Sequence, residues 1–317
     1  MKGITKIFIN VFLVISIGVR AQVNDSLKRF EDYKRSFHYT YENDLFTSTD
    51  RYYTQGSFIE LRHPVFGRSP ISKLLLKLYH SKNSMYGLAF RQDVFTPKSI
   101  LNKTLDSTDR PYAGAIYFSQ TSVSQGRWAK LSASIDVGVI GPAAVGEEQQ
   151  KFIHKHTRND EPIGWENQVA NSFMVNYNLF YEKGGLLLPW IDIIGQAGLK
   201  AGVLNTNGTL GLLTRFGKKR SYFGSTKQRQ QSWELYGSVG GTATYVYHNG
   251  VLQGVPWAKS VHVLQADKIE RLVYKLNAGI TFSIKRLSLT YSNAFISPEI
   301  KEGLAHAWGS CNIVVLF

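Results

Sequence analysis

Runs of about ten residues in which apolar and polar side chains alternate make up most of the sequence, with turn residues between them. Successive side chains of a strand point to opposite faces, so alternation with a period of two predicts strands with one face in an apolar medium. Twelve such runs occur, near 36–46, 53–63, 83–93, 112–122, 128–140, 168–181, 188–199, 205–217, 233–246, 270–283, 286–296 and 308–317. The sequence therefore predicts an all-β protein, either a soluble sandwich or a barrel that spans a membrane.

Three features of these runs favour the membrane barrel. The runs are long, Tyr and Phe concentrate near their ends as at a membrane interface, and the face opposite the apolar one carries Asn, Lys, Ser, Thr and Gly, as in a polar lumen. The last run ends on Phe317, and such a C-terminal aromatic residue, like an even strand number, is typical of bacterial outer-membrane barrels. We therefore expect a twelve-stranded antiparallel transmembrane β-barrel over residues 36–317.

The first residues have the pattern of an export signal. Two lysines precede an apolar run from Ile7 to Val19, and small residues lead up to Ala21. This run is shorter than the roughly 20 residues that cross a bilayer as a helix, so a signal peptide over 1–21 is favoured over a membrane anchor. Residues 22–35 are then expected to form an N-terminal periplasmic segment.

Charge and cysteine content exclude several kinds of site. Cys311 is the only cysteine, so the chain can form neither an internal disulfide nor a thiolate metal cage. The net charge is +14, and it falls to +11 without residues 1–21, which carry three basic residues and no acid. The surplus indicates an anionic partner, and for an exported protein lipid phosphate rather than nucleic acid, although charge that serves solubility is the alternative. No Gly-x-Ser-x-Gly elbow is present, so a serine hydrolase is not supported.

The connections after the first, third and fifth runs carry polar clusters that strand alternation does not explain. With both ends of the barrel chain periplasmic, these connections lie outside the cell and meet at one rim. Each cluster alone could be a set of turn formers or a strand stop. Together they offer a histidine base, carboxylates and amides for a hard cation such as Ca²⁺, and basic groups for phosphate. The clusters include Asn43-Asp44, Thr54, Thr96-Pro97, Asn102-Lys103, Asp109-Arg110-Pro111 and residues 141–168.

The segment Glu147–His156 lacks Gly and Pro and is predicted to form a short helix. Residues three, four and seven apart share a helix face, which would place Glu147, Gln150, Lys151 and His154 on one side. A histidine among an amide, a carboxylate and a cation is suited to proton transfer, and a solvated loop histidine is the alternative. His156 would point elsewhere, so the pair does not suggest a zinc site. Segment 64–82 is a long connection that could hold a short amphipathic helix, but we expect a packed turn on the periplasmic side.

Five motifs occur in order: ENDLFTSTDRYYTQG from Glu42, QDVFTPKS from Gln92, DRPYAG from Asp109, DVGVIGPAAVGEEQQKFIH from Asp136, and GWENQ from Gly164. In this order and spacing they resemble the outer-membrane lipid A 3′-O-deacylases, over residues 36 to 168. The resemblance implies a twelve-stranded outer-membrane barrel with its site at the outer rim, between the barrel wall and a loop helix. It also implies Ca²⁺-dependent ester hydrolysis that removes the 3′-linked acyloxyacyl chain of lipid A, the anchor of lipopolysaccharide, in the outer leaflet.

Matched motif by motif, the resemblance implies a role for individual residues. His154 would be the general base and Gln150 its helix partner, while Asn43 and Asp44 form the pair at the end of the first strand. Asp44 would be a ligand of Ca²⁺, Thr54 the site hydroxyl and Lys103 a contact to a substrate phosphate. We expect a monomer among outer-membrane lipids, with no nucleic-acid partner. A non-enzymatic pore or binding barrel, and an outer-membrane phospholipase, are the alternatives.

Overall fold

The structure is a computed structural model that describes residues 35–47, 51–79, 81, 83–101, 106–157, 160–223 and 232–317. The predicted signal peptide 1–21, almost all of segment 22–35 and the predicted phosphate contact Lys103 lie outside these residues. None of the helices in the described part of the chain is both long and apolar enough to cross a membrane.

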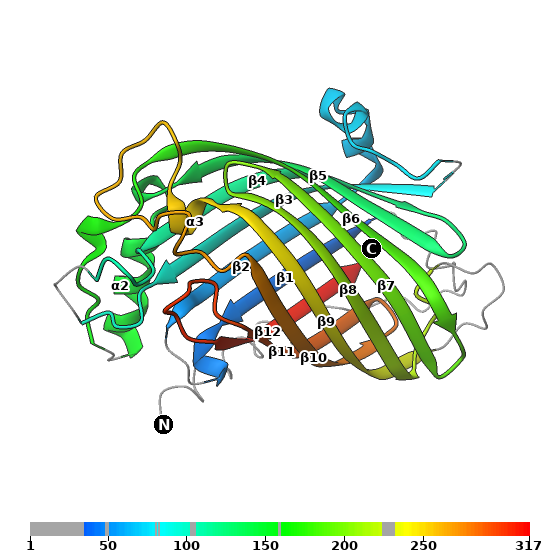
Figure 1. Cartoon of the computed structure of the whole chain (residues 1–317). Helices are drawn as coiled ribbons and strands as arrows, with labels where there is room; N and C mark the ends of the chain where they lie inside the picture. The colour runs from blue at the N-terminus through cyan, green and yellow to red at the C-terminus, as the bar shows by residue number, and fades with distance from the viewer. Residues whose placement is uncertain are drawn as a thin grey trace.

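The described residues form a closed barrel of antiparallel strands (Figure 1). Each strand pairs with its neighbours in sequence, and β1 pairs with β12, so the sheet has no free edge. The strands are β1 (Ser36–Asn43), β2 (Tyr52–Arg62), β3 (Asn83–Thr96), β4 (Ala113–Gln125), β5 (Ala129–Ile140), β6 (Ser172–Leu187), β7 (Ile191–Gly202), β8 (Asn205–Lys218), β9 (Trp233–Asn249), β10 (Leu272–Ile284), β11 (Leu287–Ile296) and β12 (His306–Leu316). The predicted twelve-stranded barrel is confirmed, with each strand overlapping its predicted run.

Register and exposure identify the two faces of the wall. Phe37 is paired with Leu61 and Leu61 with Leu88, and these three side chains are 38 to 46 % exposed. They lie on the outward face, as the apolar half of the alternation predicts. Residues one step away along each strand point into the lumen.

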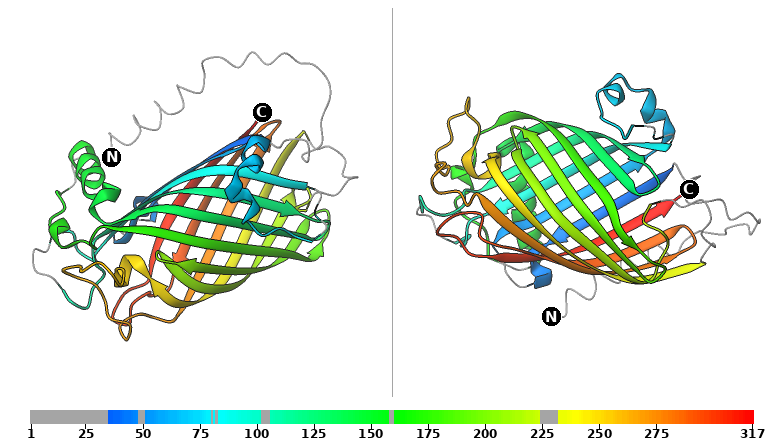
Figure 2. Two further views of the ribbon diagram at one scale, coloured as in Figure 1. Left: turned by 90° about the horizontal axis from the view of Figure 1, so that it is seen from above. Right: turned by 45° about the vertical axis from the view of Figure 1, so that its right-hand side comes forward.

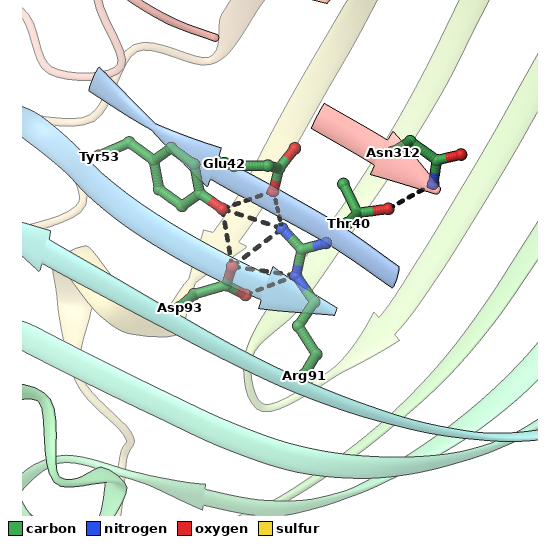
Figure 3. A network of polar contacts seen from close by, with 6 residues as sticks. All are labelled: Thr40, Glu42, Tyr53, Arg91, Asp93 and Asn312. Atoms are coloured by element: carbon green, nitrogen blue, oxygen red, sulfur yellow. Dashed lines mark hydrogen bonds and ion pairs between the residues drawn. The ribbon is translucent and has the colours of Figure 1, made fainter. Parts of the chain in front are cut away.

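Polar side chains meet inside the lumen. The guanidinium of Arg91 donates hydrogen bonds to Asp93 at 2.9 Å and to Glu42 at 2.7 Å, and the hydroxyl of Tyr53 donates to Glu42 at 2.6 Å (Figure 3). Two carboxylates thus surround one guanidinium, so these charges of the lumen are paired. The lumen is filled by side chains at this level, as expected for a barrel of modest strand number.

The connections at the end of the odd-numbered strands cover one opening of the barrel. This end, predicted to lie outside the cell, is the outer rim, and α3 (Gly250–Gln253) folds over it. Val251 and Val255 pack with residues of three strand ends, Ala115 on β4, Ile140 on β5 and Met174 on β6, in a buried apolar cluster.

An ion pair ties two of these connections together at the outer rim. Arg110, 2 % exposed, lies between β3 and β4 and pairs with Glu299, which lies between β11 and β12. The guanidinium also lies 4.9 Å from the ring centroid of Phe95. These contacts hold the outer rim closed from two sides of the barrel.

A charged cluster lies at the other end of the lumen. The ammonium of Lys219, just after β8, contacts the carboxylate of Asp192 at 2.7 Å and donates to the carbonyl of Leu188 at 3.0 Å. Arg215 pairs with the same carboxylate, and all three charged side chains are buried. Both ends of the lumen are therefore occupied by packed side chains.

Short helices mark the remaining connections. The predicted loop helix is confirmed as α2 (Gly146–Thr157), at the outer rim. The 3₁₀ helices η2 (Asp44–Thr47), η5 (Pro142–Ala144) and η6 (Trp165–Asn167) lie at the same rim, whereas η3 (Pro64–Arg68) and η4 (Pro70–Lys73) lie at the opposite end (Figure 2). Between residues 64 and 79 the described chain therefore forms two 3₁₀ turns, each opened by a proline, and no α-helix.

Candidate active site

The candidate site lies on the outward face of the barrel wall. Asn43 is paired with Gln55, Gln55 with Val94 and Val94 with Gly114, so these side chains share one face. Stepping by two along the strands leads from this row to the exposed apolar residues Phe37 and Leu88. Nevertheless Gln55 is only 3 % exposed and Val94 is fully buried. The connection between β5 and β6, with α2, covers the outside of the wall here.

A tight turn brings this connection onto the wall. The amide of Gly141 donates to the carbonyl of Gly114 at 2.8 Å, and Gly141 has a φ of 99°, which an L side chain would strain. The side-chain amide of Gln92 donates to the carbonyl of Ala144 at 2.8 Å. A Cβ on Gly114 would lie only 3.0 Å from the Cβ of Ala144, so glycine permits the close approach. The segment before α2 is thus fixed against β3 and β4.

Helix α2 turns one narrow face toward the wall. Gly146, Gln150 and His154, spaced four residues apart, are all buried. Glu147 and Lys151 form an ion pair of 2.8 Å on the flank, where the hydrogen bond that Lys151 donates to Glu147 raises the pKa of Lys151. The predicted stripe of four is therefore divided, because only the amide and the imidazole face inward.

Gln150 is oriented by Trp165. The indole Nε1, which can only donate, lies 2.8 Å from Oε1 of Gln150, so the amide oxygen accepts and its NH₂ group points away. Trp165 is 1 % exposed and packs on Tyr112 with 4.6 Å between ring centroids. Burial raises the pKa of Tyr112, whose hydroxyl donates to the carbonyl of Ile163 at 2.9 Å. Nε2 of Gln150 is buried and makes no hydrogen bond within the described residues.

His154 is 6 % exposed and is held in one tautomer. Its Nδ1 lies 2.6 Å from the carbonyl oxygen of Asp160. A carbonyl only accepts, so Nδ1 carries a proton, and in the neutral ring the lone pair that a base needs is then on Nε2. His156 is exposed and donates from Nδ1 to the carbonyl of Phe152 at 2.7 Å, which confirms that it faces elsewhere.

Asn43 and Asp44 lie where β1 passes into η2. The amide oxygen of Asn43 accepts from the Leu45 amide at 2.8 Å, and its NH₂ group donates to the hydroxyl of Tyr41 at 3.2 Å. Thr47 donates to the carbonyl of Asp44 at 3.0 Å and to that of Ala307 at 2.7 Å, which fastens η2 to β12. Asp44 is 3 % exposed. Its carboxylate is a hard oxygen ligand. Among the residues that the structure describes, no group of three or more His, Cys, Asp or Glu side chains could hold a metal ion.

Thr54 lies at an irregularity in the pairing of β2 with β3. The register shifts between Tyr53 and Gln55, and the hydroxyl of Thr54 lies 2.9 Å from that of Thr96. Both threonines are buried. Such a bulge redirects a side chain, and here it pairs two hydroxyls across the strands at the outer rim.

The five predicted site residues that the structure describes therefore gather at one rim but occupy three places. Gln150 and His154 share α2, which packs against β3 and β4, while Asn43 and Asp44 adjoin η2, which packs against β12 and β2. Thr54, on β2, lies between them. Trp165 and Thr96, which the sequence placed in the polar rim clusters without a role of their own, contact site residues. The GWENQ motif was the available signal for Trp165.

The family model described as "Outer membrane protein LpxR" matches residues 7–317. Among solved structures, LpxR from Salmonella typhimurium superposes with a TM-score of 0.72 at 18 % identity, covering 89 % of this chain and 100 % of that one. A COG4313 outer membrane channel from Pseudomonas putida F1 gives a TM-score of 0.44 at 13 % identity, covering 93 % and 100 %. The β domain of the Bordetella autotransporter BrkA gives 0.44 at 9 %, covering 89 % and 99 %. No curated protein sequence matches the chain.

Proposed function

Because the chain belongs to the LpxR family of outer-membrane proteins, we propose that it is a lipid A deacylase that removes the 3′-O-linked acyloxyacyl chain in the outer leaflet. The observation that carries this proposal is the position of Gln150 and His154. Both are buried between α2 and the outward face of the wall, at the outer rim. This position is on the lipid-facing side of the wall, so a lipid ester would approach it from the plane of the membrane and not through the lumen.

His154 acts as the general base in the proposed reaction. Its Nε2 takes a proton from a water molecule as the water oxygen attacks the ester carbonyl. The Nδ1 hydrogen bond to the carbonyl of Asp160 keeps the ring oriented and stabilises the imidazolium that forms. When the tetrahedral intermediate collapses, the sugar 3′-oxygen leaves and takes the proton back from His154. The products are the free acyloxyacyl acid and lipid A with a 3′-hydroxyl. A base of this kind contributes roughly 10² to 10⁴-fold.

Gln150 serves as a hydrogen-bond donor in this reaction. Trp165 occupies its amide oxygen, which directs the NH₂ group toward a second acceptor. The ester carbonyl is such an acceptor, and its oxygen gains negative charge in the transition state. A fixed donor stabilises that charge more than it stabilises the neutral ester.

Asp44 is the residue we assign to Ca²⁺. The donor chemistry at the start of η2 fits a hard cation, since the carboxylate of Asp44 is buried there and the same turn carries the hydroxyl of Thr47 and the backbone carbonyl of Asp44. One carboxylate makes a site of modest affinity, so carbonyl groups and water must complete it. When bound, Ca²⁺ supplies positive charge that stabilises an oxyanion. Lys103 remains the proposed contact to a phosphate of lipid A.

The two alternative functions differ in what the structure offers them. The packed side chains at both ends of the lumen, around Arg110 and Lys219, favour an enzyme over a pore. A phospholipase would use the same wall and the same helix, and so the substrate must be tested directly.

Mass spectrometry of lipid A from Gram-negative cells with and without this protein tests the proposal. We expect a loss of mass equal to one hydroxyacyl chain together with any secondary chain that it carries. Unchanged lipid A in cells that accumulate lysophospholipids would identify a phospholipase instead.

A further inference from the structure

Residues 64–79, here called the arm, fold back onto the outside of the barrel wall at the end opposite α2 (Figures 1 and 2). The amide of Leu78 donates to the hydroxyl of Ser124 on β4 at 2.8 Å. Farther along the wall, the hydroxyl of Tyr177 on β6 accepts from the amide of Leu76 and donates to the carbonyl of Leu74, both at 2.9 Å. The arm therefore crosses the wall from β4 to β6 and does not hang below it.

The wall beneath the arm is polar on its outward face. Gln120, Ser122 and Ser124 follow Phe118, which is 67 % exposed, in steps of two along β4. These three side chains are nevertheless 6, 0 and 0 % exposed. The amide of Gln120 donates to the carbonyl of Phe66 in the arm at 3.2 Å. Exposing these polar side chains to hydrocarbon would cost free energy. The arm covers them in place of lipid, and its own outer side becomes the lipid-facing surface here.

The arm's own outer surface combines apolar and basic side chains. Leu75 and Ser72 are buried toward the protein, at 3 and 2 % exposure. The exposed apolar side chains are Val65, Ile71, Leu74, Leu76 and Tyr79, and the exposed charged ones are Arg68, Lys73 and Lys77. Residues 63–79 contain no acid.

We propose that the arm binds phospholipid of the periplasmic leaflet, with a preference for anionic headgroups. Apolar side chains beside cations match acyl chains beside phosphates, which is the pattern of an interfacial membrane-binding segment. A second copy of the chain is the poorer occupant, because a twofold contact through this surface would bring the same three cations together.

The arm also stands in a fixed relation to the proposed active site. The strands β3 and β4 contact α2 at the outer rim and η3 and η4 at the other end. Phospholipid on the arm would thus lie on the same side of the barrel as the site, in the opposite leaflet. The proposal does not depend on the chemistry proposed for His154, since no residue of the arm belongs to the site.

Two measurements on the full-length protein test the proposal. Cys311 is the only cysteine, so a Cys311→Ser background allows a polarity-sensitive fluorophore to be placed at Leu74→Cys or, as a control on the outer rim, at Lys301→Cys. In vesicles of phosphatidylethanolamine and phosphatidylglycerol, we expect emission from position 74 to shift to the blue and to be quenched by brominated acyl chains, unlike emission from position 301. Emission from position 74 that resembles water and resists quenching would overturn the proposal. A blue shift that appears only at protein concentrations where dimers form would also overturn the proposal, because a second copy of the chain would then cover position 74.

Native mass spectrometry tests the preference for anionic headgroups. The variant with Arg68→Gln, Lys73→Gln and Lys77→Gln should retain less phosphatidylglycerol relative to phosphatidylethanolamine, by roughly fivefold or more. The variant Lys268→Gln with Lys301→Gln, on the outer rim, should retain it as the unmodified protein does. Equal retention by the arm variant and the unmodified protein would contradict the role of the cations. Lipid A deacylation by the arm variant should persist, so a failure of this proposal is distinguishable from a failure of the enzymatic one.

Discussion

The indole of Trp165 holds the amide of Gln150 in one orientation, through a hydrogen bond of 2.8 Å between two buried side chains fifteen residues apart. Packing against Tyr112 fixes the indole itself, at 4.6 Å between ring centroids. One amide rotamer is therefore selected before any substrate arrives, which is the preorganisation that stabilises a developing charge.

The variant Trp165→Phe should lower kcat with little change in KM. Phenylalanine keeps the ring beside Tyr112 but removes the donor, so the amide of Gln150 can rotate, and the loss of one hydrogen bond predicts a decrease of roughly five- to tenfold. Steady-state kinetics on purified lipid A measures both constants. Glu148→Gln, at an exposed position of the same helix, is the matched control. Equal losses in both variants, or none in Trp165→Phe, would contradict the orienting role.

Replacing the proposed base should abolish most of the turnover. We expect His154→Asn to reduce kcat by at least about 10²-fold at saturating Ca²⁺, since general-base catalysis is typically worth that much. Excess metal should not restore the activity. His156→Ala should remain within a few-fold of the unmodified protein, because this ring is exposed and bonded to its own helix. A comparable loss in His156→Ala would locate the base elsewhere.

Replacing Asp44 should change the Ca²⁺ dependence of the activity while the proposed base His154 remains in place. We expect Asp44→Ala to raise the Ca²⁺ concentration for half-maximal activity, on the order of tenfold, because ligand charge governs the affinity of an oxygen site. Titration of activity with Ca²⁺ after treatment with EDTA measures this shift. Full activity of the unmodified protein in EDTA would remove calcium from the mechanism.

The closed lumen predicts a barrel that conducts poorly. In planar bilayers the unmodified protein should show no steady conductance, because side chains around Arg110 and Lys219 fill both ends. The same sample should migrate faster on gels before boiling than after it, since a closed barrel resists detergent until heated. Stable open channels formed by heat-modifiable protein would contradict this prediction and support the alternative function as a pore.

The sequence predicted the barrel well because strand alternation is a local property. The alternation within each run shows which residues belong to the apolar face and which to the polar face. The C-terminal Phe317 is the residue type that typically ends the last strand of an outer-membrane barrel. The absence of Gly and Pro over Glu147–His156 likewise predicted α2. Spacing on a helix could not show which flank would face the wall, and so Glu147 and Lys151 were grouped with residues that turn inward.

Contacts between distant segments were beyond such reasoning. The pairing of Thr54 with Thr96 depends on a register shift in β2, and the polar patch around Ser122 makes sense only once the arm covers it. Both follow from tertiary packing, which overrides local pattern. Trp165 lies in the GWENQ motif, but its hydrogen bond to Gln150 depends on the packing of η6 against α2, which the sequence alone does not show.

The mass spectrum of purified lipid A, incubated in Ca²⁺ with the folded protein or with folded His154→Asn, tests the central claim most directly. The unmodified protein should convert lipid A to a species that lacks the 3′-acyloxyacyl chain, and that chain should appear as the free acid. The His154→Asn sample should retain the starting material over the same period. Unchanged lipid A in the first sample, or equal conversion in both, would contradict a deacylase that uses His154 as its base.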